Sequence, residues 1–312
     1  MTVAGVGEFG LIDRVTARLS YGSTVLLGPG DDAAVVAAPD ARVVASTDVL
    51  VEGRHFRRDW SGAHDVGRRA AAANLADVVA MGATPTALLV ALCVPADLST
   101  GWVEEFADGL GAEAAGVGAS VVGGDMSASP TLTIAVTALG DLTGRPPVTR
   151  AGARPGDLVA LAGRTGYAAA GLTVLSRGFR TPRLLVEAYR RPEVPYLAGP
   201  LAARLDATAM IDVSDGLLAD LGHVAKASGV AIDIGRDAFE VPPQMRDAGQ
   251  ALGVDPYTWL LAGGDDHALA ATFPPATTLP AQWRPIGRVA EGSGVTVDGR
   301  PFDGPAGWDH FR

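Results

Sequence analysis

Short apolar runs alternate with longer alanine-rich segments along the first half of the chain, and this alternation predicts strands interleaved with helices. We expect strands over residues 42–47, 87–94, 119–122 and 131–139, and helices over residues 64–82 and 102–115. The strand over 42–47 is expected to end in a polar turn. In the helix over 64–82, Asn74 and Asp77 are three residues apart and therefore point the same way. The apolar face of that helix is formed by Ala70, Leu75, Val78 and Met81.

The second half shows the same mixture of patterns. Residues 156–162 and 209–213 have the composition of strands, and the glycine turn at 163–166 leads into a helix. Another helix begins in the segment that follows residue 213, where Ser214 or Asp215 can cap it. The loop over 141–147 is the best candidate for a linker. We therefore expect an α/β protein with two domains, residues 1–145 and residues 150–312.

The composition agrees with two compact domains and narrows the partners. A chain of 312 residues with 48% hydrophobic and 19% charged residues can bury two ordinary cores. The net charge of −10, without a basic run longer than two residues, argues against nucleic acid and against an anionic membrane surface. The single Cys93 excludes an internal disulfide and a cysteine zinc cluster, and its apolar neighbours predict that it is buried.

We expect a cytoplasmic location. No segment approaches the roughly 18–20 consecutive apolar residues that a membrane-spanning helix needs. The first eight residues lack the basic and apolar regions of a secretory signal.

Lysine usage limits the ways in which this chain can bind a nucleotide. Lys226 is the only lysine among the 25 basic residues. A Walker A loop needs a lysine after its second glycine, and a protein kinase needs a strand lysine paired with a helix glutamate. Lys226 lies in Ala225-Lys-Ala-Ser-Gly229 and fits neither pattern. If the chain binds a nucleoside triphosphate, metal ions and arginine must neutralise the phosphates.

Glycine–aspartate segments recur along the chain and suggest that metal. The first is Gly28–Ala34, which is followed by Ala45–Gly53. Similar segments occur at residues 123–125, 212–216 and 263–266. Aspartate after glycine is common in ordinary turns, so one such segment carries little weight. Together they place carboxylates closer than turns require, and two charges about 4 Å apart repel by roughly 4 kcal/mol at an effective dielectric near 20. A bound Mg²⁺ ion would reverse that repulsion. The candidate ligands are Asp31, Asp32, Asp48, Asp77, Asp125, Asp212 and Asp215.

Four other features have both an ordinary and a functional interpretation, and the residues alone leave both open. His55 follows the second candidate metal segment, but a lone histidine is more often structural. Arg150 is suited to grip a phosphate as a planar fork, or is a solvated linker residue. Gly163–Gly171 is typical of a phosphate-binding loop, yet a glycine turn that enters a helix is more common. Trp308 would ordinarily be a core anchor.

An ordered set of motifs covers residues 5–311 and closely resembles thiamine-monophosphate kinases. The motifs are Gly7-Glu-Phe-Gly-Leu-Ile12, Gly30-Asp-Asp-Ala-Ala34, Ser46-Thr-Asp-Val-Leu-Val-Glu-Gly-Arg-His-Phe56, Asn74-Leu-Ala-Asp77, Gly123-Gly-Asp125, Asp212-Val-Ser-Asp-Gly-Leu-Leu-Ala-Asp-Leu-Gly-His223 and Gly307-Trp-Asp-His-Phe311. The resemblance implies the fold of the aminoimidazole ribonucleotide synthetase superfamily, with two α/β domains and mixed sheets covered by helices. It also implies a homodimer that binds ATP near the subunit interface.

The resemblance further implies an activity and a set of residue roles. The activity is Mg²⁺-dependent transfer of the γ-phosphoryl group of ATP to thiamine monophosphate, without a covalent nucleophile or a general base. The implied Mg²⁺ ligands are Asp32, Ser46, Thr47, Asp48, Asp77, Asp125, Asp212 and Asp215. The implied ATP contacts are Gly124, Arg150 and Ser214, and the implied contacts to thiamine monophosphate are His55, Asp265 and Trp308.

Two segments depart from the family pattern. The family usually has Gly-Gly-Glu-Asp-Tyr-Glu where this chain has Gly263-Gly-Asp-Asp-His-Ala268, so the side chain of Asp265 is one methylene shorter. After Asp125 the family often has Thr-Thr-Arg, whereas Met126-Ser-Ala128 follows here. We expect activity with altered substrate binding. The alternatives are another synthetase of the superfamily and a nucleotide-binding homologue without catalysis, and selenophosphate synthetase is disfavoured because its catalytic cysteine or selenocysteine and its lysine have no counterpart.

Overall fold

The structure, a computed structural model, describes residues 2–6, 8–29, 33–304 and 306–308 and divides into two compact units. Unit 1 consists of residues 1–78 and 83–144, and unit 2 consists of residues 79–82 and 145–312. The chain passes from unit 1 to unit 2 within the loop over 141–147. The α/β fold class expected from the sequence is confirmed.

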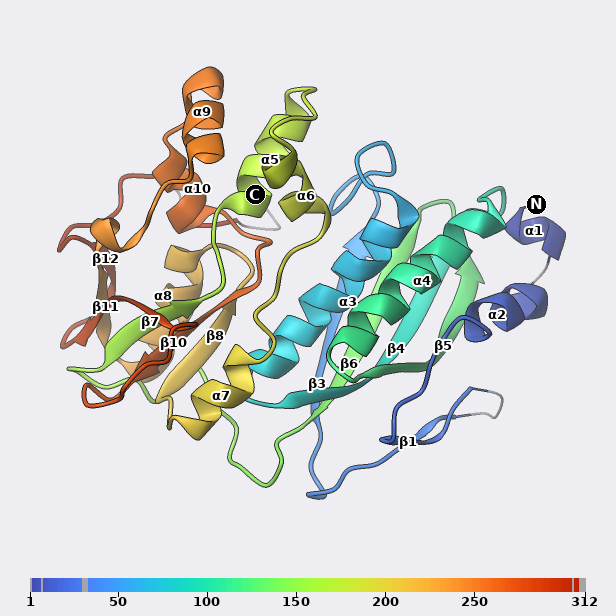
Figure 1. The fold of residues 1–312 in the computed structure, drawn as a ribbon, viewed down its shortest axis with the longest axis horizontal. Coiled ribbons are helices and arrows are strands. Elements are labelled where there is room, and N and C mark those ends of the chain that lie inside the picture. The colour runs from blue at the N-terminus through green and yellow to red at the C-terminus, as the bar shows by residue number, and fades with distance from the viewer. Residues whose placement is uncertain (1, 7, 30–32, 305, 309–312) are drawn as a thin grey trace. The chain divides into compact units, whose positions relative to one another are not determined.

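In the described part of unit 1, a four-stranded mixed sheet has the order β3-β6-β4-β5 (Figure 1). Its strands are β3 (Val44–Val51), β4 (Thr84–Val94), β5 (Ser120–Ala128) and β6 (Thr133–Asp141). A small hairpin precedes the sheet and pairs β1 (Val25–Leu27) with β2 (Val35–Val36). The helices are α1 (Val3–Val6), α2 (Glu8–Thr16), α3 (Ala63–Ala80) and α4 (Thr100–Gly116). Figure 1 shows α3 and α4 running across one face of the sheet.

The two faces of this sheet differ in burial because strand residues alternate between them. Ile134 and Val136 of β6 are fully buried on the face that α3 and α4 cover. Val49 and Leu89 lie on the opposite face and are 48% and 39% exposed. The sheet therefore has one covered face and one open, partly apolar face.

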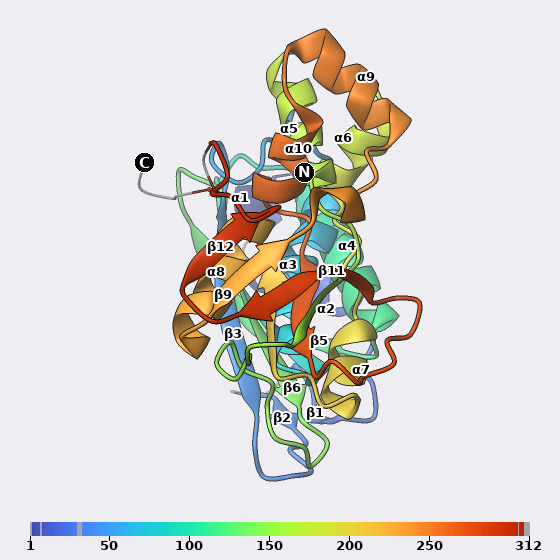
Figure 2. The same cartoon turned by 90° about the vertical axis from the view of Figure 1, so that its left-hand side faces the viewer.

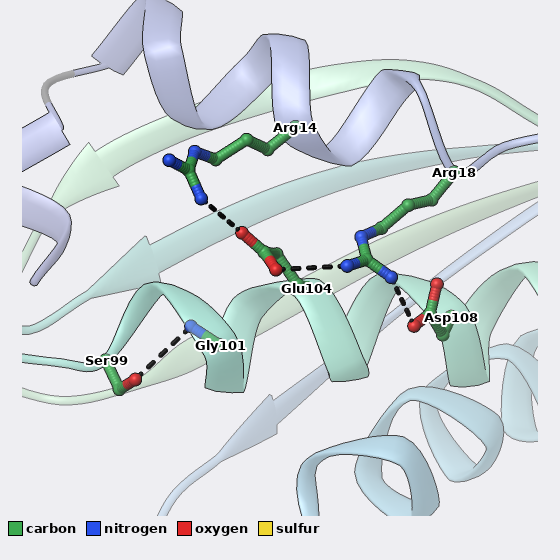
Figure 3. Close-up of polar contacts among 6 residues, drawn as sticks. All are labelled: Arg14, Arg18, Ser99, Gly101, Glu104 and Asp108. Carbon is green, nitrogen blue, oxygen red and sulfur yellow. Dashed lines mark hydrogen bonds and ion pairs between the residues drawn. The ribbon is translucent and has the colours of Figure 1, made fainter. Parts of the chain in front are cut away.

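Arg14 of helix α2 and Arg18, which lies just after that helix, form ion pairs with carboxylates of α4 (Figure 3). Arg14 binds Glu104 at 2.8 Å, and Arg18 binds Asp108 at 2.6 Å and Glu104 at 3.0 Å. Both arginine side chains are more than a third exposed, so solvent screens the ion pairs and they contribute little stability. The burial of Leu11, which is 1% exposed, contributes more. Ser99 caps the start of α4 by accepting a hydrogen bond from the Gly101 N–H at 3.2 Å.

In the described part of unit 2, a six-stranded sheet has the order β12-β9-β11-β7-β10-β8. Its strands are β7 (Leu158–Ala162), β8 (Ala209–Val213), β9 (Ala231–Ile234), β10 (Ala268–Phe273), β11 (Arg284–Ala290) and β12 (Gly294–Val297). The helices are α5 (Tyr167–Ser176), α6 (Arg183–Arg190), α7 (Ala198–Arg204), α8 (Leu217–Ser228), α9 (Pro243–Leu252) and α10 (Pro256–Ala262), with a single 3₁₀ turn at Arg236–Ala238. Helix α8 packs on β8, β9 and β12, whereas α5, α6, α9 and α10 gather at one end of the unit (Figure 2).

Most of the predicted helices and strands are present, but two strands continue through segments that we predicted to be turns. Strand β3 continues to Val51, so Ser46, Thr47 and Asp48 lie inside a strand and not in a polar turn after it. Strand β5 continues to Ala128 and contains the Gly123-Gly-Asp125 segment. Hydrogen bonds to the neighbouring strands β6 and β4 extend both elements, and these partners are remote in sequence.

Three other expectations were wrong in detail. Helix α3 is buried around nearly its whole circumference over residues 70–80 and not along a single apolar face. Helix α8 starts at Leu217 behind Gly216, and neither Ser214 nor Asp215 caps it. Cys93 is only half-buried because it lies towards the open face of the unit 1 sheet. A search of the described residues finds no helix with the length and apolar character needed to cross a membrane.

Candidate functional site

The first group of predicted site residues lies between β3 and α3 in unit 1. The Ser46 hydroxyl donates to Asp77 Oδ2 at 2.5 Å, and the Asp48 backbone N–H donates to Asn74 Oδ1 at 3.0 Å. Asn74 is 1% exposed, and its amide nitrogen donates to the Ala70 carbonyl at 2.9 Å, which fixes its orientation. The expectation that Asn74 and Asp77 point the same way is confirmed. Asn74 has no predicted ligand role, yet it positions the backbone of Asp48.

The structure does not bring the side chain of Thr47 to this group. Adjacent strand residues point to opposite faces, so Thr47 lies on the open face while Ser46 and Asp48 face α3. There the Thr47 hydroxyl donates to the Val136 carbonyl at 3.0 Å and accepts from the Thr137 hydroxyl at 3.0 Å.

Asp125 and Gly124 are also remote from Asp48. They lie on β5, at the other edge of the sheet, with β6 and β4 in between. Neighbouring strands are about 4.8 Å apart, so β3 and β5 are separated by roughly 14 Å. Asp125 is paired with Ala91 and shares its face, whereas Asp48 points to the opposite face. A Cβ atom on Gly124 would lie 1.9 Å from the Val90 carbonyl oxygen, so this position needs glycine for packing alone.

His55 follows β3 in a tight turn that fixes its tautomer. Its Nδ1 accepts a hydrogen bond from the Val51 backbone N–H at 2.9 Å. The neutral ring therefore carries its proton on Nε2, which can donate to an anionic oxygen. The side chain of Phe56, which is 1% exposed, anchors the turn.

The second group of predicted site residues lies at the end of β8 in unit 2, where two loops run side by side. The Asp265 N–H donates to the Ser214 carbonyl at 2.8 Å, and the His267 N–H donates to the Val213 carbonyl at 3.1 Å. The loop closes so tightly that a Cβ atom on Gly264 would lie 2.1 Å from the Ser214 oxygen. Asp265 and His267 both have positive φ, 68° and 52°, which aspartate and histidine tolerate better than most residues.

Asp220 organises the loop that carries Asp212 and Asp215. Its Oδ2 accepts hydrogen bonds from the backbone N–H groups of Asp215 at 3.1 Å and Gly216 at 3.0 Å. Burial, together with the negative charges of Asp212 and Asp215, raises the pKa of Asp220 from its ordinary value of 3.8 to about 7. Three carboxylates thus lie close enough to repel one another, and a cation would relieve this repulsion.

The carboxylate of Asp266 lies at the N-terminus of α5, directly after the glycine turn at 163–166, for which both a phosphate-binding loop and an ordinary turn had been left open. Its Oδ1 accepts from the Ala168 N–H at 3.0 Å, in the first turn of α5, and among the described residues its Oδ2 has no hydrogen-bond partner. Burial raises the pKa of Asp266 from 3.8 to about 7. The turn at 163–166 is therefore capped by a carboxylate of the chain itself.

The raised pKa of Asp266 predicts a pH-dependent stability. The folded protein keeps a proton that the unfolded chain releases above about pH 4, so the stability of the wild type falls as the pH rises towards 7. Asp266→Asn keeps the Oδ1 acceptor and has no group to titrate. The free energy of unfolding of Asp266→Asn, relative to that of the wild type, is therefore expected to increase by up to about 1.4 kcal/mol for each pH unit between about pH 4 and 7.

Urea denaturation at several pH values between about 4.5 and 7.5 measures this difference. The control is Asp247→Asn, which changes an exposed carboxylate on α9 and should follow the wild type at every pH. Parallel curves for Asp266→Asn and the wild type would show that Asp266 does not keep its proton on folding.

The C-terminal motif and Arg150 also belong to unit 2. The Trp308 N–H donates to the Asp215 carbonyl at 2.8 Å, and the Ala219 N–H donates to the Ala306 carbonyl at 3.1 Å. The Trp308 side chain is 60% exposed, so it is not the core anchor that its size would ordinarily suggest. Arg150 is exposed in the bend before β7, and its backbone carbonyl accepts from the Ser228 hydroxyl at 3.1 Å.

Magnesium fits the donor set of these loops. No group of three aspartate, glutamate, histidine or cysteine side chains suitable for a metal ion occurs among the residues that the structure describes. Magnesium usually takes only one or two carboxylates and completes its octahedron with water and substrate phosphates. The mutual repulsion of Asp212, Asp215 and Asp220 is the feature that a cation would relieve. Asp31 and Asp32 lie outside the described residues.

The chain is similar to several known proteins. A family model for the AIR synthase related protein, N-terminal domain, matches residues 30–142. The fold alone also matches a crystal structure of the hydrogenase maturation protein HypE of Escherichia coli, with a TM-score of 0.74 at 20% identity, over 96% of this chain and 97% of that one. Fold and site thus define a two-unit α/β protein of the AIR synthase-related class.

Closer relatives show the particular family. The thiamine-monophosphate kinase of Mycobacterium tuberculosis is 47% identical over 312 residues, 99% of this chain and 93% of the relative. A crystal structure of thiamine-monophosphate kinase from Stenotrophomonas maltophilia has a TM-score of 0.82 at 35% identity, over 94% and 97% of the two chains. A structure of AaThiL complexed with AMPPCP and TMP also has a TM-score of 0.82 at 35% identity, over 100% and 99%. The chain belongs to the thiamine-monophosphate kinase family, as its motifs predicted.

Proposed function

We infer that this protein transfers the γ-phosphoryl group of ATP to thiamine monophosphate and forms thiamine diphosphate and ADP. The observation that carries this inference is the identity of 47% over nearly the whole chain to a thiamine-monophosphate kinase. A homologue that matches the full length is complexed with AMPPCP, an analogue of ATP, and with TMP. The absence of a Walker lysine in the sequence agrees with a phosphoryl transfer that relies on metal ions and arginine.

The chemistry of the acceptor is the reason why we expect neither a covalent nucleophile nor a general base. The acceptor is a phosphate that is already anionic at neutral pH, so it needs no deprotonation. The barrier comes from bringing two polyanions into line, and catalysis consists mainly of positioning and charge neutralisation. Bound Mg²⁺ supplies that neutralisation as a Lewis acid and a template.

We assign the residues of this chain to that task as follows. Asp32, Ser46, Thr47, Asp48, Asp77, Asp125, Asp212 and Asp215 hold Mg²⁺. Gly124, Arg150 and Ser214 bind ATP, and His55, Asp265 and Trp308 bind thiamine monophosphate. The hydrogen bond from the Val51 N–H to His55 Nδ1 supports the role of His55, because it puts the proton of the neutral ring on Nε2. The side chain of Thr47 faces away from those of Ser46 and Asp48. Thr47 can therefore coordinate the ion bound by Ser46 and Asp48 only with its backbone carbonyl oxygen.

We propose that the protein is a homodimer in which a second copy covers the open face of the unit 1 sheet. The partly exposed Val49 and Leu89 on that face support this proposal. In this arrangement residues 1–145 bind metal and ATP and form the dimer, and residues 150–312 complete the active site.

A coupled measurement tests activity and assembly. The purified protein is incubated with ATP, Mg²⁺ and thiamine monophosphate, and chromatography should show thiamine diphosphate and ADP in equal amounts. Sedimentation equilibrium on the same preparation should give twice the chain mass of 31.8 kDa. A lack of product across a broad Mg²⁺ range would favour the non-catalytic nucleotide-binding homologue. A mass of one chain would remove the dimer proposal alone. We place the reaction in the cytoplasm, where ATP is plentiful, and cell fractionation checks that location.

A further inference from the structure

We propose that His267 is a positioning residue that holds the Asp212 carboxylate in the orientation in which it binds Mg²⁺. The proposal deepens the proposed function, since it rests on Asp212 being a ligand of Mg²⁺ in the phosphoryl transfer. His267 stands where the family motif usually has tyrosine, so the proposed device belongs to this chain and is not a general feature of the motif.

The contact between the two side chains is direct and shielded from water. His267 Nδ1 lies 3.2 Å from Asp212 Oδ2, and the two side chains are only 8% and 5% exposed. Among the described residues, His267 is the hydrogen-bond partner of this carboxylate. An ionised carboxylate has no proton to donate, so the ring must carry the proton on Nδ1 and donate it to Oδ2.

The backbone on both sides fixes this geometry. Asp212 lies within β8, the edge strand of the described sheet, and its Cα is held by pairing with Leu269 of β10. The His267 N–H donates to the Val213 carbonyl at 3.1 Å, directly beside Asp212. The positive φ of His267, 52°, is the conformation that keeps the loop against β8. The imidazole is therefore held in place before any ligand arrives.

With Oδ2 of Asp212 bound to the imidazole ring, Oδ1 is the oxygen that can bind Mg²⁺. With Oδ2 bound to the ring, rotation of the carboxylate is restricted and Oδ1 keeps one direction. The carboxyl group of Asp220 lies close enough for the charge of Asp212 to act on it, and without the ring this repulsion would favour an Asp212 carboxylate turned away from Asp220. Hydrogen-bond partners that orient a metal ligand typically change metal affinity by about 10- to 100-fold when they are removed.

Two substitutions distinguish the loss of the hydrogen-bond donor at residue 267 from a change in the backbone conformation of that residue. His267→Asn places an amide nitrogen where Nδ1 lies, and asparagine also tolerates positive φ. His267→Gly accepts the same φ without strain but has no donor. The two variants thus share the backbone conformation and differ in the hydrogen bond. The control is His64→Asn, which changes an exposed histidine at the start of α3.

Binding of Mn²⁺ to the ATP-free protein, followed by electron paramagnetic resonance, is the primary readout. We expect His267→Gly to weaken Mn²⁺ binding by about ten-fold or more, and His267→Asn to stay within about three-fold of the wild type. The Mg²⁺ concentration for half-maximal turnover should rise by a similar factor in His267→Gly. Because the Mn²⁺ measurement needs no turnover, a failure of the proposed kinase activity would be seen separately in the wild type.

Three results would overturn the proposal. One is unchanged Mn²⁺ affinity in His267→Gly, and another is an equal loss in His267→Asn and His267→Gly. The third does not depend on a variant that folds: a long-range proton–nitrogen NMR correlation of the wild type in which Nδ1 of His267 carries no proton. A protonated Nδ1 in the same spectrum supports the proposal.

Discussion

Replacement of Asp48 by asparagine is expected to lower turnover with thiamine monophosphate by at least about a thousand-fold, because it removes the negative charge of a carboxylate that we propose as a ligand of Mg²⁺. Asparagine has nearly the same shape as aspartate. The backbone N–H of residue 48 keeps its hydrogen bond to Asn74 Oδ1, so the fold should be preserved. The loss then reflects the missing negative charge and not a displaced strand.

The measurement compares initial rates at saturating ATP and Mg²⁺ with thermal unfolding of the same samples. The control is Asp97→Asn, an exposed carboxylate in the turn after β4 that has no proposed role, and it should retain wild-type turnover. A turnover of Asp48→Asn within ten-fold of the wild type, with an unchanged unfolding temperature, would refute the metal-binding role of Asp48.

Replacement of Gly264 by alanine is expected to destabilise unit 2 by about 3 kcal/mol and to remove most of the activity. The added Cβ would lie 2.1 Å from the Ser214 carbonyl oxygen and about 3.1 Å from backbone carbon atoms of Ser214 and Asp215. Backbone atoms cannot move aside as a flexible side chain can. The loop that carries Asp265 and His267 must therefore separate from the loop that carries Asp212 and Asp215.

A second glycine in the same unit provides the matched control. Gly222 lies inside α8, and a Cβ atom there would have no neighbour within 4 Å. Gly222→Ala should stabilise the protein by up to about 1 kcal/mol, because alanine has the higher helix propensity. Chemical denaturation and initial rates measure both variants. Wild-type stability in Gly264→Ala would mean that the two loops are free to part, contrary to their hydrogen bonds.

The ordered motifs predicted the family, and local patterns predicted most of the elements. Strand β8 has the bounds expected for residues 209–213, and α3 begins within one residue of the expected position. The shared face of Asn74 and Asp77 follows from helical periodicity, which depends only on residues three or four apart. Such features are determined by short stretches of chain, so the sequence suffices for them.

The sequence was less informative wherever partners remote along the chain decide the conformation. The run from Ser46 to Asp48 has the composition of a polar turn, yet hydrogen bonds to β6 about 90 residues later keep it in a strand. This pairing separates the side chain of Thr47 from those of Ser46 and Asp48. The pairing of β5 with β4 likewise places Asp125 in a strand remote from β3.

The sequence by itself determined the composition, with many aspartates and a single lysine, and the order of the motifs, and hence the family. Only the tertiary structure decided which carboxylates face one another, which are buried with a raised pKa and which are held by neighbours. Asp220 and Asp266 stand in motifs visible in the sequence, but their roles come from burial and from backbone N–H groups that the fold brings to them. Burial and charge proximity depend on the distances between segments, and these distances exist only once the chain has packed.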